Sequence, residues 1–150
     1  LRLGSNPAFF VLQPTSPFRS IASVTNAIEE ARESRLSSLI SVTLMDSHPS
    51  ECIVCEENSW RYLLPPPSNW SGRQSYSQSA YYINGSFYFM SLHELNKRHT
   101  LIDEHTSFWL MDEPLSIDID TAKDFEIAHA TFPLMRRYGH TYDSWSYRPT

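Results

Sequence analysis

Two aspartates, Asp118 and Asp120, have the spacing in this sequence with the clearest chemical use. They follow an apolar run that ends at Met111 and directly precede Thr121 and Asp124, which are spaced as a helix capping box. A segment between a strand and a helix is expected at the carboxyl edge of a sheet, where open α/β folds bind ligands. Because side chains two positions apart on an extended segment point to the same side, both carboxylates are expected to face one cation.

Magnesium is the cation that suits this pair. Hard oxygen ligands bind Mg²⁺, which keeps several waters and takes the rest of its shell from substrate phosphates. Two carboxylates alone make an incomplete shell, so Mg²⁺ is expected only when a phosphate ligand is present. The alternative is that Asp118 and Asp120 are solvated loop acids beside the positive end of the following helix.

The two cysteines, Cys52 and Cys55, have a spacing that suggests half of a zinc site or a redox pair. A structural zinc site needs four ligands, and His48 is the one near candidate to join them. A redox pair opens a helix, whereas the residues around this pair are typical of a strand, which would point the thiols to opposite faces. We expect buried or half-buried free thiols and keep a small zinc or redox protein as the alternative.

The first half of the chain predicts a strand, a helix and a second strand. Residues 8–12 are a short apolar run between prolines, typical of a strand buried on both faces of a parallel sheet. Ser20 is expected to cap a helix over residues 20–34. The apolar side of that helix would comprise Ile21, Val24, Ile28 and Ala31. Residues 39–44 are rich in β-branched side chains and predict the strand that completes a βαβ unit.

The second half begins with an arm and returns to alternating elements. Two short strands flank Glu57-Asn58-Ser59 as a hairpin, and three prolines then force an extended, exposed passage, so residues 51–82 are interpreted as an arm outside the main sheet. Further expected elements are a strand at 86–90, a short helix at 92–96, a strand at 108–111 and a helix from Thr121. This alternation predicts α/β layers, and residues 136–150 are left as a tail without an assigned structure.

Composition limits the possible functions. The chain has 150 residues, the size of one domain, and 17 acidic against 12 basic side chains give a net charge of −5. That balance argues against a nucleic-acid partner. The sequence has neither an apolar run of membrane-spanning length nor a signal peptide at its start, so a cytoplasmic protein without a membrane partner is expected. The chain begins with Leu rather than Met, as a fragment or a processed product would.

Three stretches in order carry a family resemblance. The first is Leu12-Gln13-Pro14-Thr15-Ser16-Pro17-Phe18-Arg19, the second is Arg73-Gln74 followed by Asn84-Gly85-Ser86-Phe87-Tyr88, and the third is Ser116-Ile117-Asp118-Ile119-Asp120-Thr121 with Asp124-Phe125. Together they resemble the acylneuraminate cytidylyltransferases, the CMP-sialic acid synthetases and their relatives that activate nine-carbon sugar acids. The resemblance covers residues 9 to about 132.

The resemblance implies a fold, a reaction and partners. Residues 1–135 would form part of a three-layer, Rossmann-like nucleotidyltransferase fold of the α/β class, with an arm-like β hairpin segment at about 51–82. The implied reaction transfers CMP from CTP to a sialic-acid-like 2-keto sugar acid and releases pyrophosphate. The partners would be the sugar acid and CMP or CTP. Because the arm mediates dimerisation in the family, a homodimer or higher oligomer built around residues 51–82 is expected.

The resemblance also implies roles for single residues. Asp118 and Asp120 would be catalytic and would hold Mg²⁺ against the phosphate and the sugar. The sugar acid would be bound by Gln13, Arg73, Asn84 and Tyr88, with Leu101 and Ile102 at the positions of an aromatic pair that lines the N-acyl pocket in the family. Considered singly, each of the first four has an ordinary alternative: a turn hydrogen bond, a surface charge, a turn and a core side chain, respectively.

The sequence departs from the family at the nucleotide side. The Gly-, Ser-, Arg- and Lys-rich loop that cradles CTP has no counterpart, so the chain is expected to start partway through the domain. Glu51 replaces a lysine that many sialic acid enzymes carry after the His-Pro pair. Two hypotheses follow. One is the carboxyl-terminal part of a CMP-sugar-acid synthetase, inactive as the isolated chain, and the other is a non-catalytic, self-associating remnant that binds a sugar acid.

Overall fold

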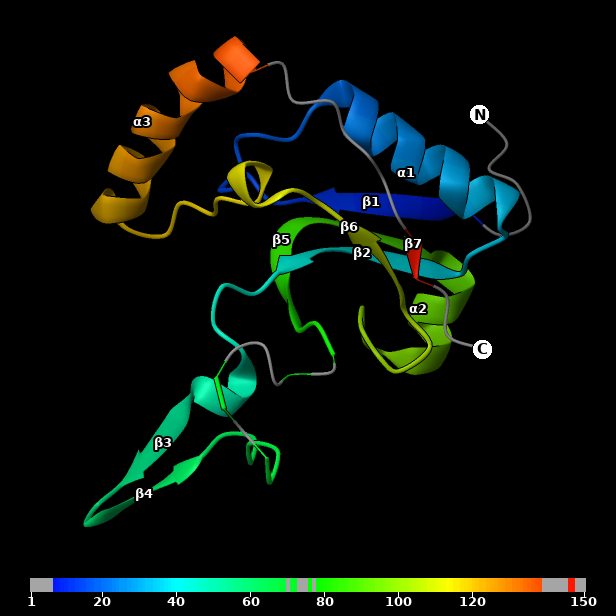
Figure 1. The fold of residues 1–150 in the computed structure, drawn as a ribbon. Coiled ribbons are helices and arrows are strands. Elements are labelled where there is room, and N and C mark those ends of the chain that lie inside the picture. Colours follow the sequence, from blue (N-terminus) through cyan, green and yellow to red (C-terminus); the bar gives the residue numbers. More distant parts are fainter. Residues whose placement is uncertain (1–6, 70, 73–75, 77, 139–145, 148–150) are drawn as a thin grey trace. The chain divides into compact units, whose positions relative to one another are not determined.

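The computed structural model describes residues 7–69, 71–72, 76, 78–138 and 146–147 (Figure 1). Its contacts divide the chain into two units, Leu1–Thr43 with Ile83–Thr150, and Leu44–Tyr82. The first unit combines a mixed sheet with helices, and the second contains a separate two-stranded sheet. The α/β prediction is therefore confirmed, and the architecture is compatible with part of a Rossmann-like nucleotidyltransferase fold.

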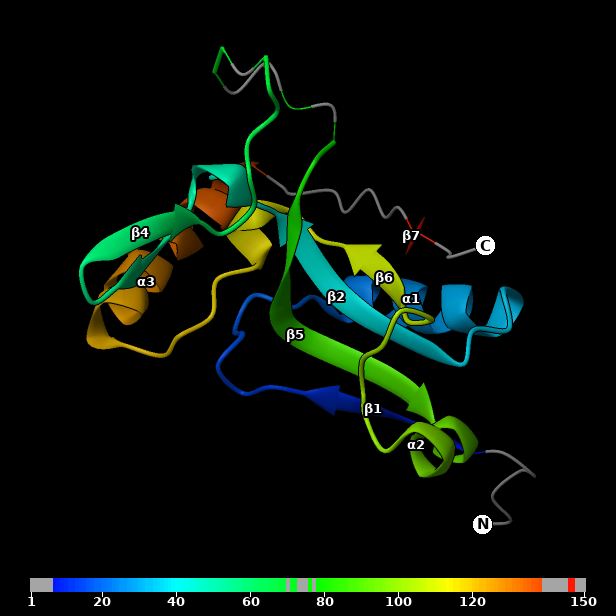
Figure 2. The same cartoon turned by 90° about the horizontal axis from the view of Figure 1, so that it is seen from below.

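The sheet of the first unit has the strand order β1-β5-β2-β6-β7. Its members are β1 (Ala8–Leu12), β2 (Ser38–Leu44), β5 (Tyr81–Ser91), β6 (Ser107–Leu110) and β7 (Ser146–Tyr147). Figure 2 shows β1, β5, β2 and β6 side by side. The pairing of β2 with β6 is parallel, and those of β1 with β5 and of β6 with β7 are antiparallel. Since Ser91 N bonds to Ser37 O and Phe87 N bonds to Ser41 Oγ, β5 also runs antiparallel to β2.

The prediction that the first strand is buried on both faces of a parallel sheet is wrong. Among the described strands β1 pairs with β5 alone and in antiparallel fashion, and Val11 and Leu12 are 39% and 45% exposed. The apolar run indicates a strand, but it carries no information on which strands lie beside it. Because β5 is inserted between β1 and β2, the two parallel strands of the βαβ unit are not neighbours.

Helix α1 (Ile21–Glu33) forms where predicted, but its buried side overlaps the predicted one only in part, at Ala31. Ser20 caps it, its Oγ accepting from Ser23 N at 2.9 Å. The buried residues are Ser23, Ala27 and Ala31, whereas Ile21 is 89% exposed. Small side chains every four residues let the helix backbone approach the sheet closely. This close packing decides which side is buried, even though the adjacent face carries larger apolar residues.

The core of the first unit lies between α1 and the sheet. It comprises Ala27, Ala31, Leu39, Phe87, Phe89, Trp109, Met111 and Leu115. Leu115 is completely buried and belongs to a 3₁₀ turn, Glu113–Leu115, that follows β6. The core therefore anchors the chain just before the segment that carries the two aspartates.

Helix α2 (Leu92–Arg98) is held by one arginine. Arg98 Nε lies 2.6 Å from Glu94 Oε2, and its Nη1 lies 2.8 Å from Asp103 Oδ1. The three side chains are 14%, 15% and 18% exposed, respectively. Further bonds of 3.4 and 3.3 Å reach the hydroxyls of Ser38 and Ser37 at the start of β2. The guanidinium thus joins α2, the loop after it and β2.

Replacing Arg98 by methionine is expected to lower the free energy of unfolding by about 2–4 kcal/mol, because two largely buried carboxylates lose their counter-charge. Urea denaturation followed by circular dichroism measures the loss. The matched control is Arg61→Met, whose ion pair with Glu56 is exposed (60% and 56%) and should contribute less than about 1 kcal/mol. Equal losses in the two variants would contradict the prediction.

The second unit contains a 3₁₀ turn (Pro49–Glu51) and the strands β3 (Ile53–Glu56) and β4 (Ser59–Tyr62). These strands pair antiparallel across Glu57-Asn58, which confirms the predicted hairpin. Both cysteines are free thiols, but the expectation that both are buried or half-buried is wrong. Cys52 is half-buried, and Cys55 is exposed because it lies on a short two-stranded ribbon with little surface to cover it.

Helix α3 (Ala122–Tyr138) follows the aspartates and continues into the segment that the sequence left unassigned. The predicted capping box is confirmed: Asp124 N is 3.3 Å from Thr121 Oγ1, and Thr121 N is 2.8 Å from Asp124 Oδ2. Within the described part of the chain, none of the helices combines the length and apolar character that a bilayer crossing needs.

Candidate functional site

Three segments of the first unit converge at Gly85. Its φ of +71° is in the left-handed region, which favours glycine. A Cβ atom built there would overlap Gln13 Oε1 and lie 3.7 Å from Asp118 Oδ2. The side chains of Gln13, from the loop after β1, and Asp118, from the segment after β6, therefore both approach the space that a side chain at Gly85 would fill.

The carboxylate of Asp118 is incompletely satisfied. The residue is half-buried, and its Oδ1 atom is fully covered without a hydrogen-bond partner. The buried hydroxyls of Ser16 and Ser86, from the two neighbouring segments, also lack partners. A covered carboxylate oxygen without a donor is costly, so this position is suited to a bound cation or a donor group on a ligand.

The other aspartates of this segment differ from Asp118 in their surroundings. Asp120 is exposed at the start of α3. Hydrogen bonds from Thr121, first from its hydroxyl and then from its backbone N–H, hold the pKa of Asp124 below its ordinary value. Asp124 is therefore committed to capping the helix, and Asp118 and Asp120 are the carboxylates left for a ligand.

Asn84 is buried, with 3% of its surface exposed, and its amide is engaged inside the protein. Its Nδ2 donates to Ser116 Oγ at 2.8 Å, and its Oδ1 accepts from Ser86 N at 3.2 Å. The Ser116 hydroxyl donates in turn to Asp112 O at 2.9 Å. The structure therefore places Asn84 beneath the aspartate segment rather than on an open surface.

Arg19 is a residue of the site to which the sequence analysis gave no role. Its Nη1 donates to the carbonyl oxygen of Gln13 and, at 3.0 Å, to that of Ser86. Burial lowers the pKa of Arg19 from the usual value of an arginine, which still leaves it a cation at neutral pH. Arg19 therefore joins the loop after β1 to β5. The one feature of the sequence that marks this residue is its position directly before the helix cap Ser20.

Three of the other predicted site residues lie in the described part of the first unit. Tyr88 is half-buried on β5 opposite Val11. Leu101 and Ile102 are half-buried in the loop that precedes β6, whereas Asp118 follows the carboxyl end of that strand. Arg73 lies outside the described residues.

The side chains available as ligands limit the kind of metal ion that could bind here. In the ranges that the structure describes, no group of three or more His, Cys, Asp or Glu side chains is placed to hold a metal ion. Asp118 and Asp120 supply two carboxylates from this segment. Such a set fits Mg²⁺, which takes its remaining ligands from water and phosphate.

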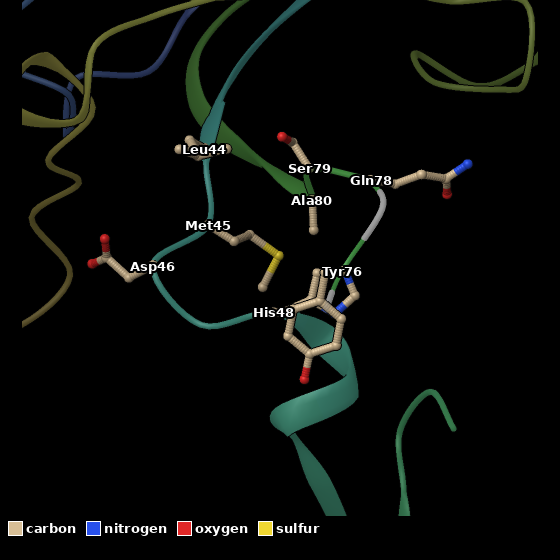
Figure 3. A pocket seen from close by; sticks show the side chains of 8 residues that line it. All are labelled: Leu44, Met45, Asp46, His48, Tyr76, Gln78, Ser79 and Ala80. Carbon is tan, nitrogen blue, oxygen red and sulfur yellow. The ribbon is translucent and has the colours of Figure 1, made fainter. Parts of the chain in front are cut away.

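A cavity of about 270 Å³ lies within the second unit (Figure 3). It is lined by Leu44, Met45, Asp46, His48, Tyr76, Gln78, Ser79 and Ala80. Figure 3 shows the rings of His48 and Tyr76 overlapping, and their centroids are 3.9 Å apart. His48 Nδ1 accepts from Ser50 N at 3.2 Å, so this ring caps the 3₁₀ turn. With Asp46 as its one carboxylate, the cavity is a weaker candidate than the cluster at Gly85.

Comparison with known proteins gives distant relatives. No protein-family model matches the chain. It is 24% identical over 120 residues, 80% of its length, to the N-acylneuraminate cytidylyltransferase of Streptococcus agalactiae serotype V (strain ATCC BAA-611 / 2603 V/R). It is 25% identical over 116 residues, 77% of its length, to the post-translational flagellin modification protein B of Campylobacter coli. These relatives support a distant cytidylyltransferase-like relationship.

The chain spans only part of these relatives. It covers 29% of the streptococcal protein and 48% of the Campylobacter protein. The relationship therefore concerns only a part of each relative, and the activity of the whole relatives is not carried over with it.

Proposed function

We propose that this chain forms the sugar and metal side of a CMP-sugar-acid synthetase site. The observation that carries the proposal is the covered, unpartnered Oδ1 of Asp118. The other oxygen of this carboxylate, Oδ2, approaches the same space at Gly85 as the Gln13 side chain. A carboxylate kept in this state is suited to a cation. The distant cytidylyltransferase-like relationship supports the choice of substrate class.

In this proposal the residues of the chain have separate tasks. Asp118 and Asp120 hold Mg²⁺ together with a phosphate ligand, and the bound ion neutralises charge on the phosphoryl oxygens. Gln13 offers an amide to the hydroxyl groups of the sugar acid. The roles of Arg73, Tyr88, Leu101 and Ile102 at the sugar rest on the family resemblance alone.

The decisive measurement is titration calorimetry of the chain with CMP-sialic acid, with and without Mg²⁺. We expect binding that requires Mg²⁺ and that Asp118→Asn weakens by about tenfold or more, equal to about 1.4 kcal/mol. Asp112→Asn is the matched control, since Asp112 is exposed and makes no capping bond with its side chain. Binding that is independent of Mg²⁺, or equal losses in both variants, would overturn the proposal.

The second candidate function, a non-catalytic self-associating remnant, is favoured by the hairpin of the second unit. Its large apolar side chains are exposed, with Trp60 at 58%, Leu63 at 55% and Ile53 at 52%. Apolar surface of this kind is a common mark of a protein interface. We therefore propose that residues 51–82 join copies of this chain into a dimer or higher oligomer.

We expect light scattering at micromolar concentration to give at least the mass of a dimer. Trp60→Ser with Leu63→Ser should shift the mass toward the monomer, because an apolar contact is lost at the hairpin. Ile21→Ser removes an even more exposed apolar side chain from α1, at 89% exposure, and should leave the mass unchanged. If the wild-type protein is a monomer in this measurement, the proposed association through residues 51–82 is wrong.

A further inference from the structure

We propose that Asn84 and Ser116 form a buried positioning pair that fixes the Asp118 segment on β5, and that Asn84 does not contact the sugar acid. This inference rests on the proposed function, because it concerns the same aspartate. It differs from the role that the sequence analysis gave to Asn84. The bonds between Asn84, Ser116 and Asp112 described above are its starting point.

The amide of Asn84 is hydrogen-bonded inside the protein at both ends. Its nitrogen donates to Ser116 Oγ and also lies 3.5 Å from Met111 Sδ, and its oxygen accepts from Ser86 N. At 3% exposure, almost none of the residue is open to a ligand. A buried polar group that loses its partner is destabilised, so a direct contact with the sugar is disfavoured.

The pair controls the segment from its amino-terminal side. Ser116 lies two residues before Asp118, and its neighbour Leu115 is completely buried in the core. On the other side of the aspartate, Ile119 N donates to Thr15 O at 2.9 Å. Asp118 is thus held on both flanks, by Asn84 through Ser116 and by the loop after β1.

The same stretch of β5 both holds the segment and makes room for it. Gly85 directly follows Asn84, and Asp118 Oδ2 is 3.7 Å from the position that a Cβ at Gly85 would take. A shift of the Ser116 turn would therefore move the carboxylate relative to Gln13. Residues that orient a ligand to a metal typically change its affinity by about 10–100-fold when they are removed.

The test is a double-mutant cycle of Asn84→Ala and Ser116→Ala in the full chain. The Mg²⁺ concentration for half-maximal binding of CMP-sialic acid should rise by about tenfold in each single variant and no further in the double variant. Ser41→Ala is the control for lost stability, because Ser41 is a buried serine of the same sheet that bonds to Phe87. It should lower the urea midpoint while leaving the Mg²⁺ dependence unchanged.

If Ser116→Ala keeps the wild-type Mg²⁺ dependence while Asn84→Ala loses binding, Asn84 contacts the bound molecule directly. That result would overturn the proposed positioning pair. Additive effects in the cycle would also overturn it. Exchange of the Asn84 side-chain amide protons, followed by NMR without any ligand, separates this inference from the proposed function. Faster exchange in Ser116→Ala is expected whether or not the wild-type protein binds CMP-sialic acid. Failure of the wild-type protein to bind would count against the proposed function. Unchanged exchange in Ser116→Ala would refute the Asn84–Ser116 pair.

Discussion

Replacing Gly85 by alanine is expected to abolish Mg²⁺-dependent binding of CMP-sialic acid and to destabilise the protein by about 1–2 kcal/mol. The backbone at this residue has a φ of +71°, which an alanine adopts at a cost of about 1–2 kcal/mol. The added methyl group would also overlap Gln13 Oε1, so the Gln13 side chain must leave its place. Calorimetry and urea denaturation measure the two effects on one preparation.

The two causes can be separated by matched variants. Gly72 also has a positive φ, +124°, but a Cβ there would meet nothing within 4 Å, so Gly72→Ala carries the backbone cost without the overlap. Combining Gly85→Ala with Gln13→Ala removes the overlapping atoms and should recover part of the stability, but not the binding. Wild-type affinity in Gly85→Ala would show that the ligand does not use the space beside Gln13 and Asp118.

The local elements of this fold could be predicted from the sequence because their causes are local. Ser20 and Thr121 cap their helices with their own side chains, and the turn at Glu57-Asn58 joins two adjacent strands. Hydrophobicity predicted the buried face of α1 only in part: it gave Ala31, whereas close packing against the sheet also selects Ser23 and Ala27 over larger neighbours.

The site was predictable in its residue types but not in their roles. Gln13, Asn84 and Asp118 come from distant parts of the sequence, and no local pattern shows that Gln13 and Asp118 meet at Gly85. Burial then separates the roles: the amide of Asn84 is engaged internally, whereas Asp118 keeps an unpartnered oxygen. Residue type alone gives a polar side chain, and only its surroundings decide whether that side chain supports the fold or binds a ligand.

The 150-residue chain, incubated alone with CTP, Mg²⁺ and sialic, ketodeoxynonulosonic or diamino sugar acids, is expected to release pyrophosphate no faster than the uncatalysed background. CMP transfer depends on positioning and charge neutralisation rather than on covalent chemistry by the protein. Holding both reactants in place supplies about 7–11 kcal/mol of the barrier. A chain that cannot hold CTP forfeits that contribution.

In the described part of the chain, two of the basic side chains that could hold a triphosphate are engaged within the protein. Lys97 and Lys123 are the two lysines of the sequence. Arg19 donates to two backbone carbonyls, and Arg98 is paired with two carboxylates. Asp118 and Asp120 repel a triphosphate unless a cation lies between them.

A coupled pyrophosphate assay with a control lacking sugar acid measures the rate. Turnover near about one per second, a typical enzyme rate, that Asp118→Asn abolishes would contradict the prediction. It would mean that these 150 residues bind CTP through groups other than the basic side chains considered above. A background rate together with Mg²⁺-dependent binding of CMP-sialic acid is the expected pair of results. Binding uses the site formed by Asp118, Gln13 and Gly85, whereas turnover also needs a held triphosphate.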